Sequence, residues 1–291
     1  MKSLPPTVAR TAAPDVRGLR IPERTLTLLR DLIAAHAGMH YDDSRLDVLR
    51  DRLAPLAIDR GFDSLLDYYY LLKYDEAAAR DWTQVIDVLS VQETYFWREA
   101  DQFHALTSAI LPKIAGRRGP IRIWSVPCAS GEEPLSIAMA LNEAGWFQRA
   151  AIEIHASDAS DSALQRAQQR RYGRRSFRQL PEELRAKYFT RQPDREEWIV
   201  KPEVYARVTS WTRVNLIQPG EAALLGGSDV IFCRNVFIYF APATVREVVA
   251  RFANWMPSPG FLCVGAAESL LRTGSGFELQ DLGGAYVYVK P

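Results

Sequence analysis

The hydrophobic pattern of this chain changes once, near residue 90, and that change limits the folds available to it. Before this point, apolar residues recur at spacings of three and four, as at Leu26, Leu29 and Ile33, which is typical of amphipathic helices. After residue 100, short β-rich runs alternate with helical segments. Such alternation favours a doubly wound, mostly parallel sheet. The sequence therefore predicts a small helical domain followed by an α/β domain.

Four helices are predicted in the first part: over about residues 23–37, from residue 43 or 44, from Ser64, and over 77–89. Gly38 is expected to end the first helix, and Ser64 is a good N-cap for the third. Residues 1–20 contain no apolar stretch and predict a disordered tail. The expected boundaries are a tail over 1–20, a helical domain over 21–89, a linker segment and helix over 90–117, and the α/β domain over 118–291.

Five short runs predict strands of the α/β domain: Ile121–Val126, Ile152–Ala156, Val230–Cys233, Phe261–Gly265 and Ala285–Lys290. Helical patterns lie between them over residues 134–144, 162–170 and 244–255. Residues 172–211 interrupt this rhythm with several prolines and further β-rich runs. We interpret this stretch as an inserted subdomain with a small antiparallel sheet.

Composition excludes several classes of protein. The net charge is +1, so no global field attracts nucleic acid or a membrane surface, and no apolar run reaches the length of about 20 residues that spans a bilayer. The three cysteines, Cys128, Cys233 and Cys263, fit neither a disulfide framework nor a zinc site and are expected to be buried thiols. No metal site is expected. We expect a cytoplasmic monomer that neither inserts into the membrane nor binds nucleic acid.

The loop after the first predicted strand, Pro127–Gly131, lies where an open α/β sheet binds its ligand. Gly131 lets the backbone approach that ligand closely. The loop lacks the G-x-G-x-x-G motif, so it is poorly suited to bind the pyrophosphate of a dinucleotide. Glu132 and Glu133 follow instead and suit a cationic ligand, such as a sulfonium or an α-ammonium group. Alternatively, these acids only offset the dipole of the next helix.

Asp158 follows the second predicted strand, where this architecture hydrogen-bonds a ribose diol. The alternative is an Asp that serves only the loop or caps the next helix. A glycine loop without pyrophosphate features and an acid at the second strand end together indicate a cationic cofactor that contains a nucleoside. S-adenosylmethionine is the natural candidate.

Five motifs then resemble, in order, those of the CheR family of chemotaxis receptor glutamate methyltransferases. They are Ser90–Glu99, Ile123–Pro134, Ala156–Asp158, Val214–Leu216 and Asp229–Phe240, and the resemblance covers about residues 22–291. It implies a Rossmann-like S-adenosylmethionine-dependent methyltransferase domain with a small antiparallel β-subdomain inserted, preceded by a small all-helical domain. It also implies S-adenosylhomocysteine as product and a chemoreceptor or related signalling protein as partner.

The resemblance assigns roles to single positions. Arg98 and Tyr239 are implied to be catalytic, with Tyr239 near the transferring methyl. The implied cofactor-binding residues are Gln92, Thr94, Arg98, Glu132, Asp158, Asn215, Leu216, Arg234 and Asn235. Among these, Glu132 would hold the methionine part, Asp158 the ribose, and Asn215 with Leu216 the adenine side.

The implied chemistry needs no strong base, because a glutamate with an ordinary pKa of about 4.3 is already an anion at neutral pH. Alignment of nucleophile, methyl and sulfur would supply most of the catalysis, and Arg98 could hold the acceptor carboxylate in a bidentate grip. Two plainer interpretations stay open. Arg98 could form only a surface ion pair with Glu99 or Asp101, and Tyr239 could only pack against neighbouring phenylalanines.

The chain departs from the family pattern at several positions. Gln92 stands where the family usually has Asn, and Trp97 stands at a Phe position. Ala266 falls in Gly265-Ala-Ala-Glu268, where Gly-His-Ser-Glu is frequent. The second predicted helix contains Pro55, which would kink it, and its arginines are offset by aspartates rather than forming a basic cluster. A basic run over residues 170–175 could compensate as a contact for an acidic receptor surface, or it could be an ordinary solvated face.

These departures leave three hypotheses. The first is a protein-glutamate O-methyltransferase that acts on a chemoreceptor or related signalling protein. The second is a methyltransferase of the same fold that acts on a different protein or a small molecule. The third is a non-catalytic cofactor-binding signalling module, against which the presence of Arg98 and Tyr239 argues.

Overall fold

The computed structural model describes residues 18–271, 273–274 and 276–291. Most of the predicted disordered tail, residues 1–17, lies outside the described residues. Arg20, the last residue of that predicted tail, forms a bridge with Ser64. Contacts within the chain divide it into two compact units. Of the described residues, one unit contains those up to Ile33 together with Tyr41–Leu89, and the other contains Ala34–His40 and those from Ser90 to Pro291. Among the helices of the described ranges, none is long and apolar enough to cross a membrane.

The first unit is helical. Its elements are α1 (Thr25–Ala37, whose end lies in the second unit), the 3₁₀ turn Asp43–Arg45, α2 (Leu46–Asp59), α3 (Leu65–Tyr74) and α4 (Ala79–Leu89). The Ser64 hydroxyl accepts a hydrogen bond from the Leu66 N–H at 3.3 Å and caps α3, as predicted. Helix α2 continues through Pro55. Buried leucines from α1, α2 and α3 form the interior, which shows that the three-and-four spacing marked the buried faces.

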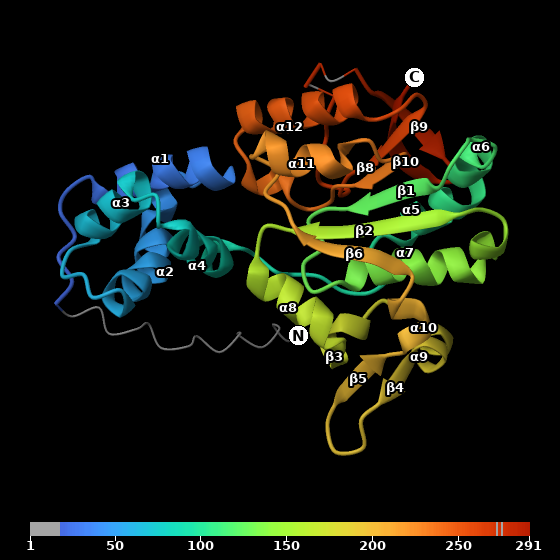
Figure 1. Ribbon diagram of the computed structural model, residues 1–291, viewed down its shortest axis with the longest axis horizontal. Helices are drawn as coiled ribbons and strands as arrows, with labels where there is room; N and C mark the ends of the chain where they lie inside the picture. The colour runs from blue at the N-terminus through green and yellow to red at the C-terminus, as the bar shows by residue number, and fades with distance from the viewer. Residues whose placement is uncertain (1–17, 272, 275) are drawn as a thin grey trace, which may run out of the picture. The chain divides into compact units, whose positions relative to one another are not determined.

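The second unit is built on a seven-stranded sheet in the order β6-β2-β1-β7-β8-β10-β9 (Figure 1). The strands are β1 (Ile121–Ser125), β2 (Ile152–Asp158), β6 (Val208–Arg213), β7 (Val230–Phe232), β8 (Gly260–Cys263), β9 (Glu278–Leu282) and β10 (Ala285–Lys290). Neighbouring strands from β6 to β8 pair in parallel, whereas β10 is antiparallel to both β8 and β9. The order reverses at β1, between β2 and β7, which creates the switch point where ligands bind in such sheets.

Helices cover both faces of this sheet (Figure 1). They are α5 (Ala100–Ala105), continued by a π-helical turn (Leu106–Ile110) and α6 (Leu111–Ile114), then α7 (Glu132–Glu143), α8 (Asp161–Gln169), α11 (Pro219–Gly226) and α12 (Pro242–Trp255), with 3₁₀ turns at Trp146–Gln148 and Phe237–Tyr239. Successive strand residues enter opposite cores. Ile123 packs with the interior shared by α7, while Trp124 packs with Phe252 of α12 at a ring distance of 5.8 Å. Because both faces are buried, most side chains of the central strands are apolar, with exceptions such as Arg122 in β1 and Glu153 in β2, and this is why the sequence identified them.

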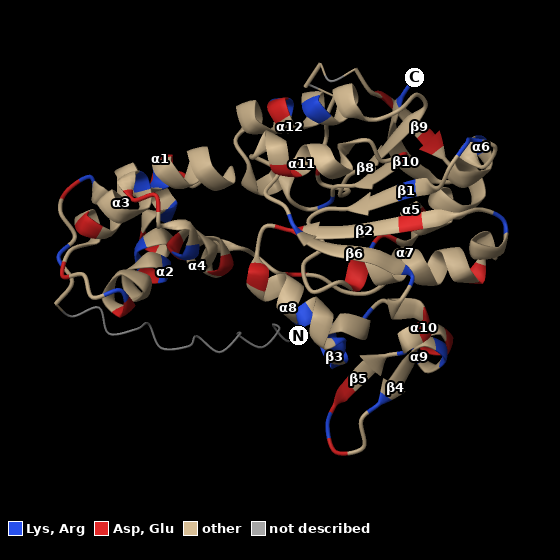
Figure 2. Cartoon of the chain, in the orientation of Figure 1, with Lys and Arg blue, Asp and Glu red and all other residues tan. Residues whose placement is uncertain are grey.

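A smaller antiparallel sheet is inserted after α8, in the order β3-β5-β4. Its elements are β3 (Arg171–Gly173), the 3₁₀ turn Arg174–Phe177, α9 (Glu182–Tyr188), β4 (Phe189–Arg191), β5 (Glu197–Val200) and α10 (Pro202–Tyr205). The predicted insertion extended to residue 211, but Val208–Arg213 pair with β2 as strand β6 of the main sheet. The basic run expected over residues 170–175 lies at β3 and the following turn, on exposed side chains (Figure 2).

Candidate active site

A pocket opens beyond the carboxyl ends of β1 and β7, at the switch point of the sheet. The space between its walls is about 460 Å³, and part of this space is open solvent. Three segments line it: the linker that follows α4, the loop after β1 and the loop after β7. The lining residues are Val91, Glu93, Thr94, Tyr95, Arg98, Phe103, Pro127, Ala129, Glu133, Arg234 and Asn235.

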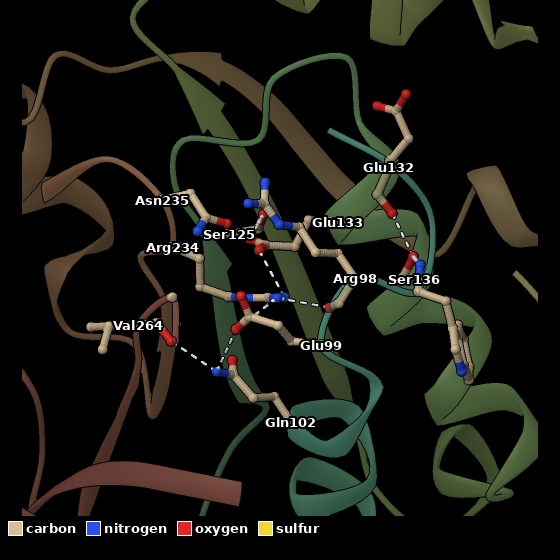
Figure 3. Close-up of polar contacts among 12 residues, drawn as sticks. Arg98, Glu99, Gln102, Ser125, Glu132, Glu133, Ser136, Arg234, Asn235 and Val264 are labelled. Atoms are coloured by element: carbon tan, nitrogen blue, oxygen red, sulfur yellow. Dashed lines mark hydrogen bonds and ion pairs between the residues drawn. The ribbon is translucent and has the colours of Figure 1, made fainter. Parts of the chain in front are cut away.

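The Arg234 guanidinium lies at the centre of a buried polar cluster (Figure 3). Its side chain is 1% exposed, and its Nη atoms lie 3.3 Å from Glu133 Oε2 and 3.2 Å from Glu99 Oε2. Arg234 Nη2 also donates to the backbone carbonyl of Arg98 at 2.7 Å. The Ser125 hydroxyl donates to Glu133 Oε1 at 2.6 Å, which fixes that carboxylate from the strand side. One guanidinium and two carboxylates give the cluster a net charge of −1.

Burial raises the pKa of Glu133 above its ordinary value, and the charge of Arg234 opposes this rise. A carboxylate that stays ionised beside a pocket attracts cationic ligands. The sequence predicted both acids as candidates for this role, and the resemblance implied Glu132 for the methionine part, which stays a prediction. The structure directs the two carboxylates differently. The Glu132 carboxylate accepts hydrogen bonds from Ser130 Oγ at 2.7 Å and Ser176 Oγ at 3.0 Å, and it points away from the Arg234 cluster (Figure 3). Burial raises the pKa of Glu132 as well.

The backbone that carries Arg98 is strained on both sides. Trp97 and Glu99 have φ values of 66° and 55°, in the left-handed region that non-glycine residues rarely adopt. Two anchors hold this turn. The Trp97 N–H donates to the buried Ser136 hydroxyl of α7 at 3.0 Å, and Arg234 binds the Arg98 carbonyl. The Arg98 side chain is thereby directed at the pocket, and Thr94, four residues earlier in the extended part of the linker, lines the same pocket.

Gln92 joins the linker to the end of β2. Its side-chain amide donates to Ser160 Oγ at 3.0 Å. The Asp158 carboxylate accepts from the Ala129 N–H and the Ser160 N–H, each at 2.8 Å, so it connects the loop after β1 to the loop after β2. Asp158 is 7% exposed. The ribose position implied for Asp158 is therefore next to the glycine loop after β1, while Gln92 is bonded to the loop after β2.

The other implied cofactor residues follow β6 and β7. Asn215 is buried, and its amide donates to the His36 carbonyl at 2.8 Å while its oxygen accepts from the Ile217 N–H at 3.1 Å. Leu216 is buried in the core under α12. Asn235 lines the pocket with φ 59°, and its N–H donates to the buried Glu268 carboxylate at 2.6 Å.

Tyr239 lies on the 3₁₀ turn four residues after Asn235, and its side chain is half-buried. Its carbonyl accepts from the His40 N–H at 2.7 Å. Tyr239 is not among the described residues that line the pocket. Of the residues implied by the first and last motifs, Thr94, Arg98, Arg234 and Asn235 line the same pocket. The position of Tyr239 relative to the reacting methyl stays a prediction.

The reversed strand order, the glycine loop after β1, the acid after β2 and the antiparallel last strands define the class of Rossmann-like S-adenosylmethionine-dependent methyltransferases. Comparison with known families agrees. The CheR methyltransferase SAM-binding domain matches residues 92–282, and the CheR methyltransferase all-alpha domain matches residues 24–90. The chain belongs to the CheR methyltransferase family, as its motifs indicated, and its cofactor is S-adenosylmethionine.

Three relatives illustrate this membership. Chemotaxis protein methyltransferase 2 of Vibrio cholerae is 34% identical, over 90% of this chain and 91% of that protein. The chemotaxis protein methyltransferase of Borreliella burgdorferi is 29% identical, over 87% and 90%. A probable biofilm formation methyltransferase WspC of Pseudomonas putida is 31% identical, over 92% of this chain and 61% of that protein.

Proposed function

We propose that this protein transfers the methyl group of S-adenosylmethionine to glutamate side-chain carboxylates of a chemoreceptor, forming a glutamate methyl ester. The observation that carries the proposal is that negative and positive charges lie at different places in the pocket. A buried cluster of net charge −1, formed by Glu99, Glu133 and Arg234, lies beside the half-buried Arg98, which lines the same pocket. A cationic donor suits the cluster and an anionic acceptor suits Arg98. Relatives named chemotaxis protein methyltransferase support the receptor as acceptor.

The residues present fit the cofactor. We propose that Glu133 faces its cationic groups, that Asp158 and Gln92 hold the ribose side, and that Asn215 and Leu216 mark the adenine side. When bound, S-adenosylmethionine supplies a methyl group activated by a positively charged sulfur. The acceptor carboxylate oxygen forms the new bond to the methyl carbon while the carbon–sulfur bond breaks, and the sulfur keeps the electron pair. No proton moves, so the chain has to align the reactants rather than provide a base.

Arg98 is proposed to position the acceptor carboxylate. A bidentate Arg–carboxylate contact fixes both oxygens and thus the line of attack. The strained turn at Trp97 and Glu99 supports this role, because a fixed backbone restricts where the guanidinium can reach. Tyr239 is proposed to complete the site near the transferring methyl. We also propose that the protein works as a cytoplasmic monomer and without nucleic acid.

A second acceptor class is favoured by one feature of the helical unit. On α2, Arg50 is paired with Asp47 at 2.8 Å and with Asp51 at 3.0 Å. Arg60, just after the helix, lies 3.1 Å from Asp81. Internally neutralised arginines attract an acidic receptor surface less than a free basic cluster would. A protein outside chemotaxis is the alternative acceptor, and the Pseudomonas putida relative is named for biofilm formation.

The decisive experiment incubates the purified protein with methyl-labelled S-adenosylmethionine and the cytoplasmic fragment of a chemoreceptor. Label that is released as methanol by mild base identifies a carboxyl ester. The control is the same fragment with its glutamates replaced by glutamine, which should take up no label. Label that resists base would refute the ester and indicate N-methylation.

Binding of the cofactor is tested separately by calorimetry, with Asp158→Ala as the comparison. Affinity for S-adenosylhomocysteine that is lost in Asp158→Ala supports the proposed ribose contact. An unchanged affinity in that variant would contradict it. This measurement does not involve the acceptor, so failure of the receptor assay with intact cofactor binding would move the proposal to the second acceptor class.

A further inference from the structure

Two arginines from distant parts of the chain face the same tyrosine at the edge of the pocket. The guanidinium carbon of Arg178 lies 3.6 Å from the centroid of the Tyr95 ring, and that of Arg98 lies 5.4 Å from it. Arg98 belongs to the linker, whereas Arg178 follows the 3₁₀ turn of the inserted subdomain. Cation–π contact with one ring thus holds both guanidinium groups at one place.

Glu93 accepts a hydrogen bond from each of the two arginines. Its carboxylate accepts from Arg178 Nη2 at 2.6 Å, and its backbone carbonyl accepts from Arg98 Nη1 at 3.2 Å. The side chains of Arg178 and Glu93 are 41% and 65% exposed, so the ion pair is in contact with solvent. An exposed ion pair of this kind is weak and exchanges readily.

The charges of this group are unbalanced. Two guanidinium groups and one carboxylate give a net charge of +1, which one further carboxylate would neutralise. Glu93, Tyr95 and Arg98 line the pocket that also contains the buried cluster of net charge −1. The rim of the pocket is thus complementary to an anion, whereas its buried side is complementary to a cation.

We propose that Arg178, stacked on Tyr95, is a second acceptor-binding residue beside Arg98, and that Glu93 occupies it until a carboxylate of the acceptor takes its place. The inference deepens the proposed function and rests on it. The Glu93 carboxylate is then an internal competitor that resembles the acceptor side chain. An acceptor with a carboxylate next to the methylated one satisfies both arginines, whereas an isolated glutamate satisfies only Arg98.

The test measures the kcat and KM of methyl transfer to the cytoplasmic fragment of a chemoreceptor, together with S-adenosylhomocysteine affinity by calorimetry. Arg178→Ala should raise the KM for the fragment about tenfold, as expected for the loss of a charge-assisted contact, and leave the affinity for S-adenosylhomocysteine unchanged. Arg191→Ala is the matched control, since Arg191 is an exposed arginine on β4 of the same subdomain. Tyr95→Leu removes the aromatic face on which both guanidinium groups lie and should also raise the KM.

Glu93→Gln supplies the sharper readout, because removal of the competitor should lower the KM severalfold. That gain should disappear when Arg178→Ala is present as well. If the wild type is active, either of two outcomes would overturn this inference alone. One is a KM for Arg178→Ala equal to that of Arg191→Ala. The other is a decrease in KM from Glu93→Gln that is as large in the Arg178→Ala background as in the wild type. A wild-type protein that binds S-adenosylhomocysteine but methylates no receptor fragment would overturn the proposed acceptor, and this inference with it.

Discussion

Replacing Arg234 by methionine tests whether the buried cluster organises the site. Methionine keeps most of the side-chain volume and removes the charge, which leaves Glu133 and Glu99 facing each other at 13% and 20% exposure without their shared cation. Removing one partner of a buried ion pair costs about 3–5 kcal/mol, because the remaining charge stays desolvated. For a unit of about 200 residues, each kcal/mol lowers Tm by about 2–4 °C. The expected loss in Tm is therefore about 6–20 °C.

The destabilisation should depend on pH in a defined direction. Burial already raises the pKa of Glu133, and Arg234 opposes that rise, so Arg234→Met should raise the pKa further. A carboxyl group whose pKa is higher in the folded than in the unfolded state makes the free energy of unfolding fall as the pH rises through the folded pKa. The deficit of Arg234→Met should therefore be larger at about pH 8 than at about pH 5. Adding Glu133→Gln should restore much of the loss, since it removes the uncompensated charge.

Urea unfolding monitored by tryptophan fluorescence measures these free energies directly. The matched control is Arg122→Met, because Arg122 pairs with Glu153 at 3.1 Å on the surface, with 54% and 36% exposure. Such a pair contributes about 0–1 kcal/mol. If Arg234→Met were no less stable than Arg122→Met, or if its deficit grew toward acid pH, the cluster would not be the buried charge network described above.

Three further predictions concern the pocket itself. Glu133→Gln should weaken S-adenosylmethionine binding about tenfold. In the wild type, the dissociation constant measured by calorimetry should rise from about pH 8 to about pH 5, because the Glu133 carboxylate, whose pKa is raised, is protonated as the pH falls. The variant should show no such pH dependence. Ser136→Ala removes the acceptor of the Trp97 N–H, so it should cost about 1–3 kcal/mol in urea unfolding and lower kcat more than cofactor affinity; an unchanged kcat would contradict the role of this anchor. Gly131→Ala places a Cβ 2.9 Å from the Trp211 ring at φ +95°, so thermal unfolding should reveal a loss of about 1–3 kcal/mol, and full stability would show that the loop can move.

The sequence predicted the sheet because its central strands are buried on both faces. Such strands are mostly apolar, and the helices between them have their own periodicity, so the hydrophobic pattern predicted both kinds of element. Strand β6 was assigned to the insertion because Val208–Arg213 contains threonine, serine and arginine and lies at the sheet edge. Only its pairing with β2 shows to which sheet it belongs. Edge strands carry a weaker hydrophobic signal, so their partners have to be seen in the structure.

The site was predictable to the level of motifs but not of side-chain directions. Glu132 and Glu133 are adjacent in the first turn of α7, where neighbouring side chains point about 100° apart, so only one of them can face the pocket. The resemblance implies Glu132 for the methionine part, which stays a prediction, whereas Glu133 is the acid that lines the described pocket. The strained turn around Arg98 was equally hidden, because Trp97 and Glu99 are not residues that favour left-handed backbone. Their conformation follows from distant partners, Ser136 and Arg234, which no local pattern connects with them.

The division of charge in the pocket also bears on turnover under the proposed mechanism. Methyl transfer removes the negative charge of the acceptor carboxylate, so an ester leaves Arg98 and Arg178 without the anion that the rim accommodates. A neutral ester accepts weaker hydrogen bonds from guanidinium groups than a carboxylate does. The rim should accordingly hold the substrate more firmly than the product, and the Glu93 carboxylate lies within reach to pair with Arg178 again. The Glu93 carboxylate thus lowers the affinity for the acceptor but favours release of the methylated side chain. This release gives a reason for a carboxylate at position 93.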